Sequence, residues 1–170
     1  MQNPLQSVRE HSRGSLWLPV SLLVFTIATD HITKTAARKV LADSGEIPLL
    51  GGLVKFSLVE NFEGFLGIVR GLPPSLQFFF LYVCVTLLLA CCLAYLFFLN
   101  KSSRYDIPLA LVTGGGLSNL LDRLLNNGGV TDFMIIAVGG LQTGIFNLAD
   151  VYILFGSFIL GFSFFSRIER

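Results

Sequence analysis

The sequence predicts a mostly helical membrane protein, with four transmembrane helices and a small extracytoplasmic β-sheet that would form a cradle. The first reason is composition: 53% of the 170 residues are hydrophobic, only 14% are charged, and the mean hydropathy is +0.71. A soluble domain of this size could not bury so much apolar surface. The second reason is that four apolar stretches approach the length of about 20 residues that a bilayer requires. No linker, repeat or low-complexity tract divides the sequence, so we expect a single membrane domain over residues 1–170.

The first predicted helix covers about residues 16–33. Its apolar part continues into a polar end that contains Asp30 and Lys34, and it is preceded by Arg9 and Arg13. A signal peptide can look like this, but no small-x-small cleavage site precedes the polar residues. We therefore expect an uncleaved helix.

The segment at about 35–74 is too long for a simple connection between two helices. Residues 53–60 are rich in strand-forming side chains, which predicts a small sheet lying on the membrane. Residues 61–67 then form a predicted turn, in which Asn61 and neighbouring aromatic side chains are candidates to line a groove. The alternative is an interfacial anchor, because aromatic residues favour that depth in membrane proteins generally.

Three further helices are predicted at about 75–99, 107–125 and 146–165. The helix at 75–99 is uncharged and holds all three cysteines, which we expect to serve as small hydrophobic side chains. The other two helices contain several glycines, as tightly packed membrane helices often do.

A β-hairpin is predicted just before the last helix. Two strand-like runs, 131–138 and 141–146, are separated by a pair of glycines at 139–140, which is typical of a tight turn. If the turn centres on those glycines, Val138 pairs with Leu141.

The same register brings two carboxyl groups together. Counting outward from the turn places Asp132 opposite Asn147, and Asp150 lies one helical turn further on, within side-chain reach of Asp132. Two carboxyl groups that meet at one site can share a proton and so divide into an acid and a base.

Further polar side chains collect at the predicted extracytoplasmic ends of three helices. They are Asp30, Asn119, Asp122, Arg123, Asn147 and Asp150. An ionisable group at membrane depth is energetically costly, so such a group is a functional candidate. The alternative is that these groups hold the helices together, with Arg123 paired to Asp122.

The charge pattern predicts the orientation in the membrane. Four spans place both termini on one side, and three short basic flanks lie on that side, at Arg9 and Arg13, Lys101 and Arg104, and Arg167 and Arg170. The positive-inside rule makes this side cytoplasmic. We therefore expect a multi-pass protein with both termini in the cytoplasm and the polar cluster near the extracytoplasmic face.

Four blocks of sequence carry a family resemblance. They are Asp-His-Ile-Thr-Lys at 30–34, Gly-Gly-Leu-Ser-Asn-Leu-Leu-Asp-Arg at 115–123, Val-Thr-Asp-Phe at 130–133 and Phe-Asn-Leu-Ala-Asp at 146–150. Together they resemble the lipoprotein signal peptidases (signal peptidase II), membrane aspartic endopeptidases of bacteria. The resemblance covers most of the chain, and the last three blocks in combination are highly specific.

The resemblance implies a role for each polar residue. Asp132 and Asp150 would be the catalytic dyad. Positioning of the dyad and the substrate is implied for Asn61, Asn119, Arg123 and Asn147. Structural support is implied for Asp30, which would brace the extracytoplasmic sheet, and for Asp122.

Three residues depart from the family pattern. Ser118 stands where a glycine is usual, His31 where a glutamine is frequent, and Glu63 where a glycine is expected. These changes leave the dyad intact. They bear on substrate range, and on whether the chain is a housekeeping enzyme or a specialised paralogue.

The reaction implied by the resemblance is cleavage of a prolipoprotein before its diacylglyceryl-cysteine in the bacterial cytoplasmic (inner) membrane. The expected partners are lipid-modified prolipoproteins and membrane lipids, and we expect a monomer. A formal net charge of +1 gives no indication of nucleic-acid binding. No metal or organic cofactor is expected, because no His or Cys accompanies the carboxylates, and His31 is expected to be a hydrogen-bonding residue.

Two alternatives belong to other functional classes. One is a proton-coupled membrane transporter, but the carboxylates gather at one face and no inverted repeat is visible. The other is a non-catalytic lipoprotein-binding paralogue in which Glu63 fills the substrate groove.

Overall fold

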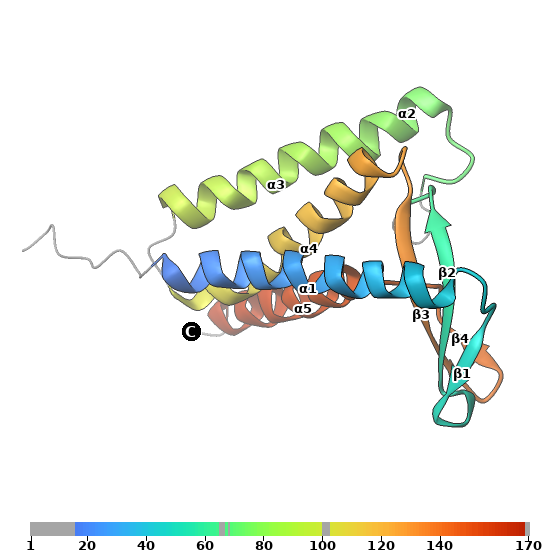
Figure 1. The fold of residues 1–170 in the computed structure, drawn as a ribbon. Coiled ribbons are helices and arrows are strands. Elements are labelled where there is room, and N and C mark those ends of the chain that lie inside the picture. Colours follow the sequence, from blue (N-terminus) through green and yellow to red (C-terminus); the bar gives the residue numbers. More distant parts are fainter. Residues whose placement is uncertain (1–15, 65–66, 68, 100–102, 169–170) are drawn as a thin grey trace, which may run out of the picture.

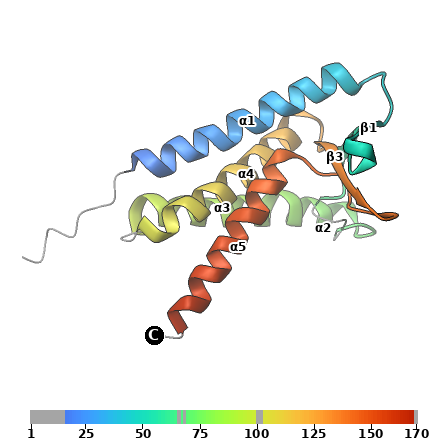
Figure 2. The same cartoon turned by 90° about the horizontal axis from the view of Figure 1, so that it is seen from below.

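Long helices meet a small antiparallel sheet at one end of the molecule (Figure 1). The computed structural model describes residues 16–64, 67, 69–99 and 103–168. The mostly helical class and the small sheet are confirmed. Figure 2 shows that α1 starts and α5 ends at the end of the bundle far from the sheet, as expected for termini on one side.

The first helix, α1 (Trp17–Leu41), has 25 residues and ends eight residues beyond the predicted boundary at 33. The prediction ended near residue 33 because charged residues follow it. In the structure Asp30 and Lys34 are buried on the face of α1 that also buries Leu23 and Leu41, so the buried stripe continues through the polar end. Ala37 and Leu41 then pack against Phe133 of the sheet, which extends the helix beyond the predicted boundary.

The second long helical segment runs without interruption from Pro74 to Leu99, close to the predicted 75–99. It consists of α2 (Pro74–Phe78), the wider turns of η3 (Phe79–Cys84), α3 (Val85–Ala94) and the wider turns of η4 (Tyr95–Leu99). Proline is accepted at its start because the first turn of a helix lacks backbone partners for its N–H groups.

The remaining long helices are α4 (Asp106–Leu125), which follows the short η5 (Ser103–Tyr105), and α5 (Leu148–Ile168). They pack closely, as their glycines predicted. A Cβ atom added at Gly115 would lie 2.6 Å from the carbonyl oxygen of Ala149, so no larger residue fits there without movement. The backbones can therefore approach each other directly above the polar end of the bundle.

The sheet has four strands in the order β1-β2-β3-β4, all antiparallel. Its strands are β1 (Ile47–Leu49), β2 (Val54–Asn61), β3 (Val130–Val138) and β4 (Leu141–Gln142), with η1 (Leu50–Gly52) between the first two. The predicted strands at 53–60 and 131–138 are therefore confirmed. β2 and β3 pair so that Val59 is opposite Asp132.

The hairpin turn is confirmed, but its second strand is shorter than predicted. Val138 pairs with Leu141 as expected. The strand expected to reach residue 146 ends at Gln142, because the hydroxyl oxygen of Thr143 accepts the N–H of Ile136 at 3.0 Å, and the chain then leaves the ladder. An isolated bridge between Met134 and Phe146 follows, one residue out of the predicted register.

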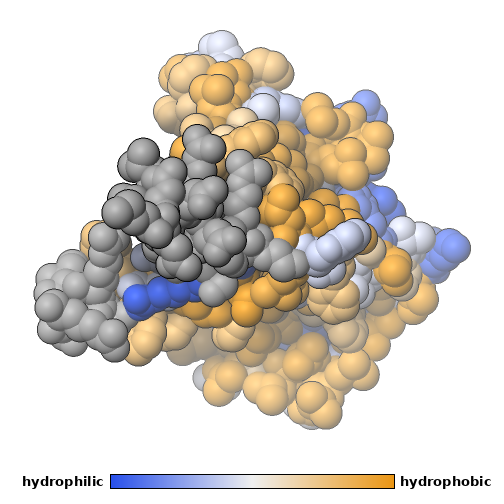
Figure 3. Space-filling view, turned by 90° about the vertical axis from the view of Figure 1, so that its left-hand side faces the viewer, coloured by the Kyte–Doolittle hydropathy of each residue, from blue (hydrophilic) through white to orange (hydrophobic). Residues whose placement is uncertain are grey.

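Two of the described helices, Pro74–Leu99 and Leu148–Phe165, are long and apolar enough to cross a membrane. The outer surface of the second helix fits that reading, since its residues Phe155, Phe158 and Phe162 are 59%, 71% and 70% exposed. Figure 3, which views the bundle from the end away from the sheet, shows apolar residues over much of the visible surface. Of the basic flanks, Arg9, Arg13, Lys101 and Arg170 lie outside the described residues, and so does Phe65 of the predicted turn.

Candidate active site

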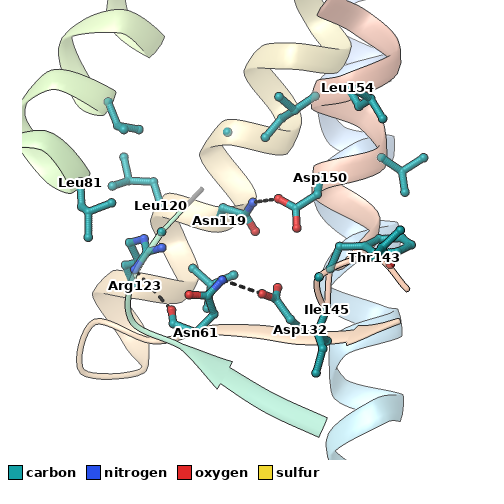
Figure 4. A pocket seen from close by; sticks show the side chains of 18 of the residues that line it. Asn61, Leu81, Asn119, Leu120, Arg123, Asp132, Thr143, Ile145, Asp150 and Leu154 are labelled. Carbon is teal, nitrogen blue, oxygen red and sulfur yellow. Dashed lines mark hydrogen bonds between the residues drawn. The ribbon is translucent and has the colours of Figure 1, made fainter. Parts of the chain in front are cut away.

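A cavity of about 590 Å³ lies where the helices meet the sheet (Figure 4). The α2–α3 segment contributes Leu81 and Val85 to its wall, and α5 contributes Leu154. The polar side chains in the wall are Asn61, Asn119, Arg123, Asp132, Thr143 and Asp150. A mostly apolar cavity with a few convergent polar groups is typical of a binding site.

Asp132 reaches this cavity from β3, in the sheet and outside the helices. Its side chain is 2% exposed, and each carboxylate oxygen accepts one amide hydrogen bond. Asn61 Nδ2 donates to Oδ2 at 2.8 Å, and Asn147 Nδ2 donates to Oδ1 at 2.7 Å. Burial raises the pKa of Asp132 to about 7; the charge of Asp150 acts in the same direction, while the two amide hydrogen bonds oppose it. This carboxyl can therefore carry a proton near neutral pH.

Asp150 is positioned by the start of α5. Asn147 is the residue before the first helical position, and its Oδ1 accepts the N–H of Asp150 at 2.9 Å. Asp150 Oδ2 in turn accepts the N–H of Asn147 at 3.2 Å. This reciprocal pair is a capping box, in which two backbone donors at a helix start are satisfied by side chains three residues apart. The cap fixes the direction in which the Asp150 carboxylate points.

Two asparagines connect the carboxylates. Asn147 Nδ2 contacts Asp132, as above, and also lies 3.1 Å from Asn119 Oδ1. Asn119 Nδ2 donates to Asp150 Oδ1 at 2.9 Å. Figure 4 shows the side chains of Asp132 and Asp150 directed toward the same space beside Asn119. The structure thus brings together five of the residues that the sequence singled out, namely Asn61, Asn119, Asp132, Asn147 and Asp150.

Arg123 lines the cavity next to this group, but it is not paired with Asp122. Its Nη1 donates to the carbonyl oxygen of Gly128 at 2.8 Å and lies 3.5 Å from that of Asn61. The alternative in which Arg123 and Asp122 neutralise each other is therefore wrong. Asp122, on the other side of α4, contacts Lys34 at 2.9 Å.

Lys34 is the main polar residue of the site whose role the sequence analysis missed. Its side chain is 0% exposed, and its Nζ lies 2.6 Å from Asp30 Oδ2, 2.9 Å from Asp122 Oδ2 and 2.9 Å from Asn119 Oδ1. The signal in the sequence was the spacing of Asp30 and Lys34, because residues four apart lie on one helical face.

Asp30 supports the helices rather than the sheet. Its Oδ1 accepts the N–H of Ala149 at 2.9 Å, and its Oδ2 accepts the hydroxyl of Ser118 at 2.7 Å, so it joins α1 to α4 and α5. The predicted bracing of the sheet by Asp30 is not observed, because α1 continues for about two further turns before Ala37 packs against the sheet. Asp122 makes that connection, since its Oδ2 accepts the N–H of Thr131 in β3 at 3.1 Å. Ser118, a departure from the family pattern, thus fills a structural position.

The other two departures lie outside this cluster. His31 Nδ1 is 4.0 Å from Asp122 Oδ1, and its Nε2 has no hydrogen-bond partner among the described residues, so the expected hydrogen-bonding role is not observed. Glu63 pairs with Arg70 at 3.0 Å, with both side chains substantially exposed. Glu63 is also absent from the described lining of the cavity, so the expectation that it fills a groove is wrong.

Within the described parts of the chain, no three His, Cys, Asp or Glu side chains converge in an arrangement that could hold a metal ion.

Comparison with known proteins gives the chain its family. Residues 22–166 match the family model described as signal peptidase (SPase) II. A protein named lipoprotein signal peptidase from Caldicellulosiruptor bescii is 35% identical over 141 residues, which cover 83% of this chain and 86% of the relative. The protein of that name from Aquifex aeolicus is 32% identical over 155 residues, or 90% of this chain and 89% of the relative.

Solved structures show a similar fold. Two structures described as a bacterial membrane enzyme superpose with TM-scores of 0.75 and 0.72, at 19% and 20% identity. The first covers 87% of each chain, and the second covers 86% of this chain and 91% of the other.

Proposed function

Because this chain belongs to the signal peptidase II family, we propose that it is an aspartic endopeptidase that removes signal peptides from lipid-modified prolipoproteins. The bond cleaved is the one before the diacylglyceryl-cysteine. The observation that carries the aspartic mechanism is a pair of carboxylates, Asp132 and Asp150, held by a shared Asn147 at the wall of an apolar cavity.

The proposed chemistry uses the two carboxyl groups in different protonation states. One ionised carboxylate takes a proton from the attacking water, and the other carboxyl, protonated, gives one to the carbonyl oxygen or to the leaving amine. The pKa of Asp132, raised to about 7 by burial, supports the coexistence of both states near neutral pH. Asn61, Asn119, Arg123 and Asn147 position the dyad and the peptide, while Asp30 and Asp122 support the helices that carry them.

The cavity has the chemistry that a lipidated peptide requires. Most of its described wall is apolar, with Leu81, Val85 and Leu154 on the two helices that are long and apolar enough to cross a membrane. Acyl chains are stabilised by burial against such side chains, at about 0.8 kcal/mol for each buried CH₂ group. The polar groups stand at the sheet end, where the peptide bond would lie.

The direct test is a cleavage assay with the purified protein in detergent. The substrates are a synthetic prolipoprotein peptide with a diacylglyceryl-cysteine and the same peptide without lipid, and mass spectrometry identifies the products. We expect a single cut before the cysteine of the lipidated peptide only. Lipopeptide binding without a cut would support the non-catalytic paralogue, and proton flux without binding would support the transporter.

We also propose that the single domain is a monomer in the bacterial cytoplasmic membrane, with four spans and cytoplasmic termini. Besides the two apolar helices, α1 has 25 residues and α4 has 20. At a rise of about 1.5 Å per residue, both are long enough for a hydrocarbon core of about 30 Å. Their polar residues gather at the sheet end, which would place the site near the extracytoplasmic face.

Cysteine labelling tests this orientation. Cys84, Cys91 and Cys92 are first replaced by serine, and single cysteines are then introduced at Ser44 and Ser103. We expect an impermeant thiol reagent to label position 44 but not position 103 in intact cells. Labelling of position 103 from outside would overturn the topology.

A further inference from the structure

The ammonium group of Lys34 is fully used by its three contacts. An ammonium has three protons and no acceptor. Two of its protons face carboxylates, Asp30 at 2.6 Å and Asp122 at 2.9 Å, and the third faces the amide oxygen of Asn119 at 2.9 Å. With no exposed surface and no spare proton, Lys34 is not placed to act on substrate. Its charge acts across space on both Asp132 and Asp150, and its contact with Asn119 links it to Asp150 alone.

Each asparagine around the dyad is oriented by a group that can only donate. The N–H of Glu63 fixes the Oδ1 of Asn61 at 3.0 Å, and the N–H of Asp150 fixes the Oδ1 of Asn147 at 2.9 Å. Which end of a side-chain amide holds oxygen follows from such partners. For Asn119 the donor-only partner is Lys34, the single side chain among these three orienting groups.

The orientation of the Asn119 amide determines whether Asp150 accepts a hydrogen bond from it. Because its oxygen must face Lys34, its Nδ2 is left to donate to Asp150 Oδ1 at 2.9 Å. Asn147 Nδ2 also donates to the Asn119 oxygen, at 3.1 Å, but it brings no charge. A cation bound to an amide oxygen polarises the amide and strengthens the hydrogen bond that its N–H donates.

The two carboxylates of the dyad therefore differ. Asp132 accepts hydrogen bonds from two neutral side-chain amides, those of Asn61 and Asn147. Asp150 accepts one from a backbone N–H in a helix cap and one from the amide bound to Lys34. Hydrogen bonds to the charged form favour that form. Besides Lys34, the charged groups around Asp150 are Asp30 on α1, Arg123 on α4 and Asp132 on β3.

We propose that Lys34 is a positioning residue which, through the amide of Asn119, holds Asp150 as the ionised member of the dyad. Asp150 is then the base that activates water, and Asp132 is the acid. This inference rests on the proposed aspartic peptidase function and adds to it the assignment of the two carboxyl roles.

The test compares two double variants in one background. Asp122→Asn removes one negative charge, and a second substitution, Lys34→Met or Arg38→Met, removes one positive charge from the same cluster. Both cations contact Asp122, Lys34 at 2.9 Å and Arg38 at 3.6 Å, and of the two only Lys34 contacts Asn119. The Arg38 variant is therefore a control matched for charge and for contact with Asp122, at a side chain that is 36% exposed where Lys34 is buried.

We expect the Lys34 double variant to lose roughly 10- to 100-fold in kcat with KM nearly unchanged, the loss typical when a supporting partner of a reactive group is removed. Its acidic limb in the pH–rate profile moves to higher pH, because the base is less readily ionised. The Arg38 double variant keeps the kcat and pH profile of Asp122→Asn. Equal profiles for the two double variants would overturn the role of Lys34.

A single substitution tests the same link without removing Lys34. Asn119→Asp keeps an oxygen for Lys34 but has no N–H for Asp150, so we expect a loss of kcat similar to that of the Lys34 double variant. Wild-type kcat in Asn119→Asp would contradict the inference even if the Lys34 double variant failed to fold. If wild-type protein does not cleave the lipidated peptide, the proposed function itself fails; if it cleaves and the variants behave alike, only the role of Lys34 fails.

Discussion

Four aspartates meet at the sheet end of the bundle, and they form two pairs with different partners. Asp30 and Asp122 are 0% and 1% exposed and share the ammonium of Lys34. Asp132 and Asp150 share Asn147 and form no salt bridge within the described residues. A cation in direct contact favours the charged form of a carboxylate, and among the described residues neither Asp132 nor Asp150 has such a contact. The partners, rather than the residue type, therefore separate a structural pair from a candidate catalytic pair.

The largest effect on activity is expected for the candidate catalytic pair, Asp132 and Asp150. Asp132→Asn and Asp150→Asn each remove one proton-exchanging group and keep nearly the same volume. We expect each to reduce turnover of a lipidated peptide by roughly 100- to 10,000-fold, the usual range for loss of a general acid or base. Thermal melting in detergent should show that both variants still fold. Near wild-type turnover in either one would show that the dyad is assigned incorrectly.

Substitution in the pair that shares Lys34, Asp30 and Asp122, should lower the stability of the protein. Asp30→Asn leaves a buried ammonium with one carboxylate and places an amide where Lys34 requires an acceptor. We expect a loss on the order of 3 kcal/mol in the free energy of unfolding, since breaking a buried ion pair leaves an uncompensated charge. Asp43→Asn, at an exposed position just after α1, is the control and should melt like wild type. Equal melting temperatures for the two variants would mean that the Lys34 pairs contribute little.

The asparagine between the two catalytic carboxylates should matter less than either carboxylate. Asn147→Ala removes the donor to Asp132 Oδ1 and the side-chain half of the cap on α5. We expect kcat to fall roughly 10- to 100-fold, because the residue orients groups rather than exchanging protons. Asn126→Ala is a suitable control, since Asn126 contacts Asp122 at 3.2 Å and not the dyad. An equal or larger loss of kcat in Asn126→Ala would show that the effect does not depend on contact with the dyad.

The pH profile distinguishes the acid from the base. With a pKa of about 7, Asp132 is protonated below that pH and ionised above it. If Asp132 is the acid, kcat/KM is retained below about pH 7 and falls about tenfold per pH unit above it. Measurement of the wild-type enzyme between pH 5 and pH 9 tests this. A rate that rises through pH 7 and stays high would reverse the assignment.

The smallest effect is expected at Glu63, outside both pairs. Its exposed contact with Arg70 resembles other surface ion pairs, which contribute about 0–1 kcal/mol. We expect Glu63→Ala to change the free energy of unfolding by less than about 0.5 kcal/mol, because surface substitutions usually have small effects. The turnover of several prolipoproteins should change by less than about twofold. Arg70→Ala, which removes the other half of the pair, should behave in the same way. A broader substrate range in Glu63→Ala alone would show that this segment approaches the substrate.

Much of the fold could be predicted from the sequence because its signals are local. The uncharged run at 75–99 specified a helix by length and apolarity, and the glycine pair at 139–140 specified the turn between Val138 and Leu141. The capping box of Asn147 and Asp150 is a local feature too, with its two residues three positions apart, but it was not predicted. The family blocks contain most of the candidate site residues, and the hairpin register predicted that Asp132, Asn147 and Asp150 lie close together.

The tertiary structure decided the features that join distant parts of the chain. The burial of Lys34 depends on Asn119, 85 residues away, and the position of Asp30 depends on the N–H of Ala149, 119 residues away. The length of α1 was likewise set by packing of Ala37 and Leu41 on the sheet. Local patterns report hydrogen bonds and apolar faces within a few residues, so they identified the four aspartates. Which carboxylates meet a cation, and which meet only neutral donors, was determined by the helices and the sheet that pack around them.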